Sequence, residues 1–146
     1  MSFNELINKL PQEIIIHHIC PYLYLPQSKK LCHDIKSFVF TKNYLYNTYS
    51  SKYSLYKCNR QWLLTDITRF INSYNSYYFR YSNLFYAKMK KLFILRDKKL
   101  EYVHRFMLML EYKLPPEIGI HIKIGILTPK ERSSLICFVN HVISKS

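Results

Sequence analysis

Histidine and cysteine side chains gather near the start of the chain, where metal binding is the first chemistry to consider. His17, His18 and Cys20 are followed by Cys32 and His33. On a helix His17 and Cys20 share one face, but Cys32 and His33 complete a tetrahedral zinc site only if the chain folds back. The spacing matches no standard ligand pattern. The sequence therefore predicts no metal site and no cofactor.

Catalytic combinations are equally sparse. Cysteine and histidine pairs can be drawn from four cysteines and six histidines, but nine scattered acids offer no close carboxylate pair. Glycine occurs only twice, so the chain holds no glycine-rich loop that cradles the phosphates of a nucleotide. These features predict that the protein is not an enzyme.

Positive charge gathers in the middle of the chain. Residues 35–96 hold eleven lysines and arginines against the single acid Asp66, and ten of the fourteen tyrosines lie between Tyr44 and Tyr86. Cations neutralise phosphates while aromatic rings stack on bases, so this region is a candidate nucleic-acid interface. The residues named for it are Arg60, Trp62, Arg69, Arg80, Lys88, Lys90 and Lys91. A solvated basic face, or a surface docked on an acidic protein partner, explains the same residues.

Capping signals and apolar spacing predict that most of the chain is helical. Ser2 and Glu5 fit a capping box, Pro11 suits a first helical turn, and Thr128 with Glu131 gives the best-marked start of all. The predicted helices cover residues 2–10, 11–20, 28–39, 59–71, 77–92, 100–110 and 128–143. The fold class predicted is mainly α, a small helical bundle.

Two segments depart from this pattern. Residues 40–58 are rich in tyrosine and asparagine with little periodicity, so they predict a loop with a helical turn. Residues 117–126 alternate with period two through five isoleucines and contain both glycines, which is typical of a strand. A helix remains the alternative. As a strand this segment has an open edge, so we expect it to serve assembly with a second chain.

Leu10-Pro11-Gln12-Glu13-Ile14 opens a segment that resembles the start of an F-box. The motif continues through an apolar helix to Tyr22-Leu23 and then to a second amphipathic helix with Leu31 and Phe38. The resemblance covers about 30 residues. It implies a helical docking module that binds the Skp-type adaptor of a cullin-RING ubiquitin ligase. The partner-binding residues that it implies are Leu10, Pro11, Ile14, Ile15, Ile19, Leu23 and Leu31.

The F-box resemblance divides the chain into residues 1–40, a helical docking module, and residues 41–146, a basic helical region packed with it as one domain. The alternative for the opening motif is an ordinary proline-initiated amphipathic helix that packs into the core. A second Leu-Pro opening, at residues 114–118, shows that this pattern arises easily.

The amino-acid composition allows predictions about the source organism and the cellular compartment of the protein. The residues in excess are those with AT-rich codons, as in the genomes of many large DNA viruses, whose proteins often carry F-box-like openings. Four widely spaced cysteines, no secretory signal and no apolar run long enough to span a bilayer predict an intracellular protein with small, buried cysteines. We therefore expect a non-enzymatic interaction protein in the host cytoplasm or virion. The alternative is a basic structural component of a virion or nucleoprotein that binds viral structural protein or genome.

Overall fold

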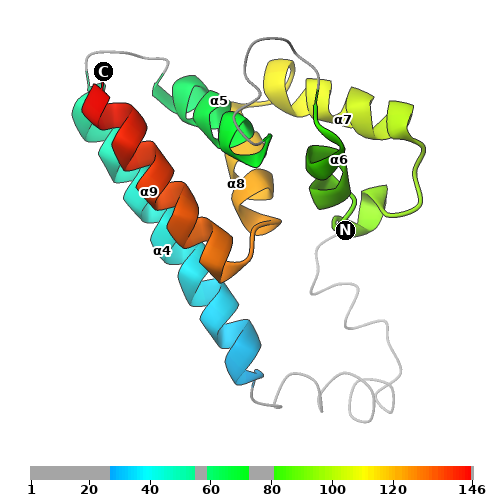
Figure 1. The fold of residues 1–146 in the computed structure, drawn as a ribbon, viewed down its shortest axis with the longest axis horizontal. Helices are drawn as coiled ribbons and strands as arrows, with labels where there is room; N and C mark the ends of the chain where they lie inside the picture. The colour runs from blue at the N-terminus through cyan, green and yellow to red at the C-terminus, as the bar shows by residue number, and fades with distance from the viewer. Residues whose placement is uncertain (1–26, 55–58, 73–80, 146) are drawn as a thin grey trace, which may run out of the picture. The chain divides into compact units, whose positions relative to one another are not determined.

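The computed structural model describes residues 27–54, 59–72 and 81–145 and is mainly helical, as predicted (Figure 1). The chain divides into two compact units, residues 1–32 and 33–146. Within the described ranges the elements are α4 (Lys29–Lys52), α5 (Asn59–Ile71), α6 (Asn83–Met89), the 3-10 helix η2 (Phe93–Leu95), α7 (Leu100–Tyr112), α8 (Pro116–Gly125) and α9 (Pro129–Lys145).

Local capping signals mark the starts of several helices. The Ser28 Oγ accepts a hydrogen bond from the Leu31 amide at 3.1 Å and begins α4. At α9 the predicted capping box is confirmed, because the Glu131 amide donates to the Thr128 Oγ1 at 3.3 Å and the Glu131 carboxylate accepts from the Thr128 amide at 2.9 Å. These bonds satisfy amides that the first helical turn leaves without a partner.

The loop predicted over residues 40–58 is wrong for most of its length, because α4 continues to Lys52. Thr41, Leu45 and Tyr49 recur at i, i+4 and i+8 and are all buried. Three buried contacts on one face stabilise a helix whose tyrosines and asparagines have modest helix propensity. The prediction missed these three positions because the surrounding tyrosines and asparagines show little apolar periodicity.

The strand predicted over residues 117–126 is also wrong, and with it the proposed assembly edge. Residues 116–125 form α8, which begins at a proline in its first turn. Gly119, Ile120, Lys123 and Ile124 are buried, so two pairs of residues spaced by four lie against the rest of the unit. Because α8 packs on both α5 and α7, it tolerates apolar side chains around most of its circumference.

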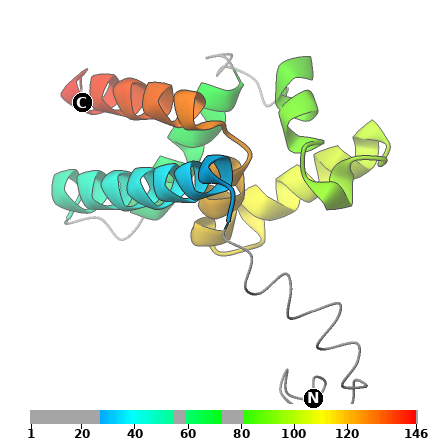
Figure 2. The same ribbon diagram turned by 90° about the horizontal axis from the view of Figure 1, so that it is seen from below.

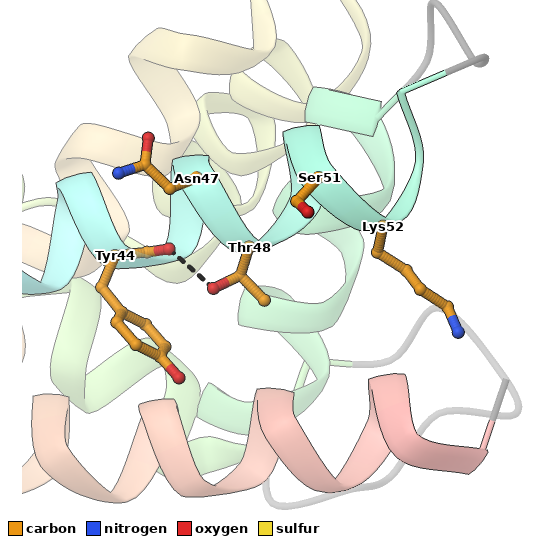
Figure 3. A pocket seen from close by; sticks show the side chains of 5 residues that line it. All are labelled: Tyr44, Asn47, Thr48, Ser51 and Lys52. Carbon is orange, nitrogen blue, oxygen red and sulfur yellow. Dashed lines mark hydrogen bonds between the residues drawn. The ribbon is translucent and has the colours of Figure 1, made fainter.

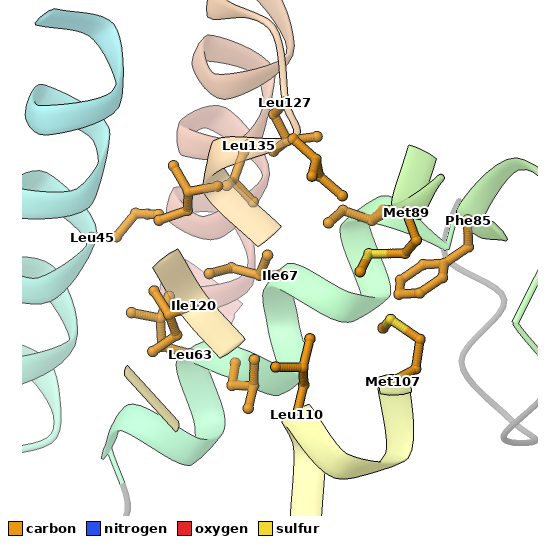
Figure 4. Close-up of a cluster of buried hydrophobic side chains, with 14 of the residues drawn as sticks. Leu45, Leu63, Ile67, Phe85, Met89, Met107, Leu110, Ile120, Leu127 and Leu135 are labelled. Carbon is orange, nitrogen blue, oxygen red and sulfur yellow. The ribbon is translucent and has the colours of Figure 1, made fainter. Parts of the chain in front are cut away.

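The core lies where α5, α7 and α8 meet (Figure 4). Figure 4 shows side chains converging from α4, α5, α6, α7, α8 and α9 on this centre. The apolar spacing of Leu100, Val103, Met107 and Leu110 predicts α7, and the last three have no exposed surface, whereas Leu100 is 53% exposed. Each such side chain contributes about 1.5–3 kcal/mol when fully buried.

Helices α4 and α9 lie side by side in both views (Figures 1 and 2). Asp34 pairs with Arg132, and the Tyr44 hydroxyl donates to Asn140 Oδ1 at 3.1 Å, so the two helices run in the same direction. Within the ranges that the structure describes, no helix is long and apolar enough to cross a bilayer.

Candidate functional site

Six of the seven partner-binding residues implied by the F-box resemblance, Leu10 to Leu23, lie outside the described residues. The seventh, Leu31, lies in the first turn of α4 with 43% of its surface exposed. What the structure does describe is the helix that follows the motif.

The first half of α4 presents large apolar side chains to solvent. Ile35, Val39 and Phe40 are 49%, 43% and 63% exposed, and we call these three residues the α4 apolar face. Ile35 and Val39 lie one helical turn apart on one stripe, and Phe40 lies about 100° further round the helix. The fully buried residues of α4 all belong to its second half, from Thr41 onward.

An ion pair between a buried arginine and a partly exposed aspartate holds the first half of α4 in place. Arg132 of α9 is 1% exposed, and its Nη1 donates to Asp34 at 2.8 Å for Oδ1 and 2.9 Å for the backbone carbonyl. The same guanidinium donates to the carbonyls of Ile124 at 3.0 Å and Gly125 at 3.4 Å. One side chain therefore joins α4 to α9 and to the carboxyl end of α8, where a cation is favourable.

Several of the residues named for a nucleic-acid interface bind partners inside the protein. Arg60 lies over the Tyr46 ring, 3.7 Å from its centroid, and donates to the Tyr46 carbonyl at 3.5 Å. Arg69 donates to Asp66 at 3.2 Å, and Lys88 donates to the Glu131 carboxylate. These contacts reduce the charge available to a phosphate backbone.

The remaining members of that set are placed differently. Trp62 is 37% exposed and meets the Tyr53 ring edge-on, with the centroids 4.9 Å apart. Lys91 is exposed and Lys90 is half-buried, and no carboxylate within the described ranges forms an ion pair with either. Arg80 lies outside the described residues. The structure thus does not gather the seven residues into one set of unpaired cations.

Around Tyr46 the Arg60 contact extends into an aromatic cluster. The Tyr46 hydroxyl is hydrogen-bonded to His121 Nε2 at 3.1 Å, and the two rings stack with centroids 6.0 Å apart. The Phe38 ring meets His121 at an angle of 71°. Burial, reinforced by the charge of Lys42, lowers the pKa of His121, which favours the neutral imidazole.

A second polar cluster surrounds a buried lysine that the sequence did not single out. Lys123 has no exposed surface, and its Nζ donates to Glu111 Oε1 at 2.9 Å and to Thr68 Oγ1 at 2.5 Å. The other Glu111 oxygen accepts a hydrogen bond from the Tyr81 hydroxyl at 2.7 Å. Burial lowers the pKa of Lys123, against the opposing effect of Glu111, and burial with the Glu111 hydrogen bond raises the pKa of Tyr81.

This cluster joins α5, α7, α8 and the segment before α6. Its donors and acceptors satisfy one another, and Lys123 is enclosed, so a substrate in solvent reaches the ammonium only if the helices separate. The arrangement therefore positions helices rather than binding a ligand. In the sequence the only signal was a lysine within an isoleucine-rich run and a glutamate at the end of a Met- and Leu-rich one.

A shallow hollow of about 690 Å³ lies along the second half of α4 (Figure 3). It is lined by Tyr44, Asn47, Thr48, Ser51 and Lys52. Figure 3 shows the Thr48 hydroxyl directed back to the Tyr44 carbonyl, to which it donates at 2.8 Å. The lining supplies a single cation and no acid or imidazole, so it offers no base to activate a hydroxyl nucleophile.

A second hollow, of about 630 Å³, contains Cys137 and His141 of α9. Both side chains are exposed and lie one turn apart. The prediction that the cysteines are buried is wrong for Cys137 and only partly right for Cys32, which is half-buried. The hydroxyls of Ser133 and Ser134 in this hollow donate to carbonyls of their own helix.

The histidines and cysteines considered as metal ligands are divided by the limits of the described residues. His17, His18 and Cys20 lie outside them, whereas Cys32 and His33 fall in the first turns of α4. Over residues 27–54, 59–72 and 81–145 no three His, Cys, Asp or Glu side chains cluster as metal ligands do.

Comparison with known proteins gave no relative: no protein-family model, curated protein or solved structure matches this chain. The class defined by the fold is a small, mainly helical protein.

Proposed function

We propose that the chain is a non-enzymatic docking protein that binds a protein partner through apolar helical surface. Exposure of the α4 apolar face is the observation that carries the proposal. Three large apolar side chains in solvent, within six residues of one helix, are typical of a surface that another protein covers.

Rigidity supports this role. Arg132 binds Asp34, so the helix that carries Ile35 and Val39 is fixed to α8 and α9 before a partner arrives. A partner that binds a preformed helix does not have to order it, which leaves more of the contact energy for affinity.

The partner proposed is a Skp-type adaptor, bound through the F-box-like residues Leu10 to Leu31 together with the α4 apolar face. In that role the chain links the adaptor to a second protein, in the host cytoplasm. The internal use of Lys123, Glu111 and Tyr81 agrees with binding rather than catalysis, because these three groups hydrogen-bond one another and Lys123 is enclosed.

Purified Skp-type adaptor is the probe for this proposal. Ile35→Ala with Phe40→Ala removes exposed side chains only, so the variant should fold normally and lose about 30-fold or more in adaptor affinity. A second double variant, Ile15→Asp with Leu23→Asp, tests the F-box-like segment. The matched control is Leu84→Ala with Leu100→Ala, two residues that are 51% and 53% exposed on α6 and α7.

Affinity is measured by titration calorimetry and folding by circular dichroism. Wild-type affinity retained by both folded double variants, or no binding of the adaptor by the wild-type chain, would overturn the proposal.

A basic structural component of a virion or nucleoprotein is the second candidate. The observation in its favour is the exposed run of cations between Lys90 and Lys99. A duplex DNA shift that weakens steeply with salt would support it, because each phosphate contact releases counterions. The internal partners of Arg60, Arg69 and Lys88 argue against a broad phosphate-binding face.

A further inference from the structure

The 3-10 helix η2 holds two large apolar side chains out in solvent. Phe93 is 83% exposed and Ile94 57%, whereas the next residue, Leu95, has no exposed surface. The Leu95 amide donates to the Leu92 carbonyl at 3.0 Å, and the Lys98 amide donates to the Leu95 carbonyl at 3.2 Å. The buried Leu95 thus anchors a tight turn, and Phe93 and Ile94 within this turn stay exposed.

Cations surround this apolar pair on both sides. Lys90 and Lys91 precede it, and Arg96, Lys98 and Lys99 follow it, with Asp97 as the one acid between residues 90 and 99. The Arg96 guanidinium lies 5.8 Å from the centroid of the Phe93 ring. We call residues 90–99 the η2 turn.

We propose that the η2 turn binds the surface of an anionic phospholipid membrane. Phe93 and Ile94 enter the boundary between headgroups and acyl chains, while the surrounding lysines and Arg96 contact lipid phosphates and carboxylates. Apolar side chains that reach into lipid beside cations that stay at its surface are the pattern of peripheral membrane contact. This inference is independent of the proposed protein partner.

Charge complementarity argues for an anionic occupant, and the apolar pair selects among anions. A nucleic-acid strand offers flat bases, on which Phe93 stacks, but it takes an aliphatic side chain such as Ile94 only between unstacked bases, which costs free energy. A lipid bilayer accommodates both side chains, because apolar contact with acyl chains requires no particular orientation of the side chain. Adjacent insertion of an aromatic and an aliphatic residue therefore favours a membrane over a nucleic-acid strand.

The cations set the lipid dependence. Each lysine or arginine near an anionic bilayer strengthens binding about fivefold, so loss of two should weaken it about 25-fold. Vesicles of phosphatidylcholine alone supply the apolar boundary without the negative charge and should bind weakly. A single short turn is too small for insertion that withstands high salt.

Vesicle flotation with the full chain tests the proposal. Wild-type protein should float with vesicles that contain about 30% phosphatidylserine, and far less with phosphatidylcholine alone. Phe93→Ala with Ile94→Ala should reduce the bound fraction about tenfold or more. The matched control is Ile35→Ala with Phe40→Ala, which removes the same two residue types from exposed sites on α4 and should float as the wild type does.

A second pair of variants tests the charge. Lys91→Gln with Lys98→Gln should weaken vesicle binding about 25-fold, whereas Lys113→Gln with Lys130→Gln, equal in charge and exposed elsewhere, should change it less than about threefold. Circular dichroism confirms the fold of each variant.

Three results would overturn the proposal. One is absence of wild-type flotation at low salt. Another is equal flotation by the η2 and α4 apolar variants. The third is an effect of Phe93→Ala with Ile94→Ala on self-association or on duplex DNA binding but not on vesicles, which would assign the turn to a second copy or to nucleic acid. Adaptor binding by the η2 variant keeps this test separate from that of the proposed docking function.

Discussion

Helix α8 contains two glycines whose replacement by alanine should have opposite effects. At Gly125 an added Cβ meets nothing within 4 Å. At Gly119 it would lie 3.0 Å from Leu64 Cδ1 and 3.1 Å from the Leu110 carbonyl oxygen. Both substitutions gain helix propensity, so a net loss of stability at Gly119 reports how closely α8 approaches α5 and α7 there.

The magnitude follows from these distances. Alanine in place of a helical glycine stabilises by about 0.5–1 kcal/mol, less near a helix end, so Gly125→Ala should gain about 0.5 kcal/mol. At Gly119 the same gain is opposed by an overpacking cost of about 1–3 kcal/mol. The Leu110 oxygen belongs to the backbone of α7 and moves only with that helix. Gly119→Ala should therefore lose about 1 kcal/mol.

Urea unfolding followed by circular dichroism provides the measurement. The two variants should differ by about 1.5 kcal/mol in the free energy of unfolding, with the slope against urea unchanged. Leu64→Ala offers a control: its cavity makes room for the new methyl, so Gly119→Ala should cost less in that background. Equal stability of Gly119→Ala and Gly125→Ala would refute the close packing described for α8.

Three further perturbations address the buried charges. Glu111→Gln leaves the Lys123 ammonium buried without its carboxylate and should cost about 3–5 kcal/mol at pH 7. Because burial lowers the pKa of Lys123 in the folded chain, urea titrations should show this loss shrinking as pH rises toward the ordinary lysine pKa of 10.5. Burial raises the pKa of Glu131, but hydrogen bonds from Lys88 and Thr128 outweigh it and lower the pKa to about 2. The wild type therefore has a stabilisation above about pH 4.5 that it loses as pH falls through about 2, and Glu131→Gln should remove it. Melting temperatures of both proteins against pH check this prediction. Arg132→Met leaves backbone carbonyls at the end of α8 unpaired and should lower the free energy of unfolding by about 1–3 kcal/mol. Backbone amides in the first half of α4 should also exchange faster with solvent, and unchanged exchange there would contradict the anchoring role of Arg132.

Local signals predicted several elements correctly. The capping box at Thr128 and Glu131 and the spacing of Val103, Met107 and Leu110 depend on residues within a turn or two, and α7 and α9 form where they predict. Such signals work because a helix's first amides and its buried face are satisfied by near neighbours in the chain.

The candidate docking face was only partly predictable. The amphipathic helix predicted over residues 28–39, with Leu31 and Phe38, forms as the first part of α4. Which side chains stay exposed was not predictable, because exposure depends on where Arg132, 98 residues further along the chain, holds Asp34. The same reasoning applies to Lys88, whose partner Glu131 lies 43 residues away.

The sequence by itself determined that the described part of this protein is helical, where its best-capped helices begin, and that its charge is strongly positive. Only the tertiary structure decided the state of residues 117–126 and the role of their lysine. Alternating isoleucines suit a strand with one wet face, but packing against α5 and α7 removes water from several sides of the segment at once. One face of the segment, with Gly119, Ile120, Lys123 and Ile124, is buried at the spacing of a helix, and a helix satisfies its own backbone there. Lys123 is tolerated on that face because Glu111 and Thr68, brought from two other helices, bind its ammonium.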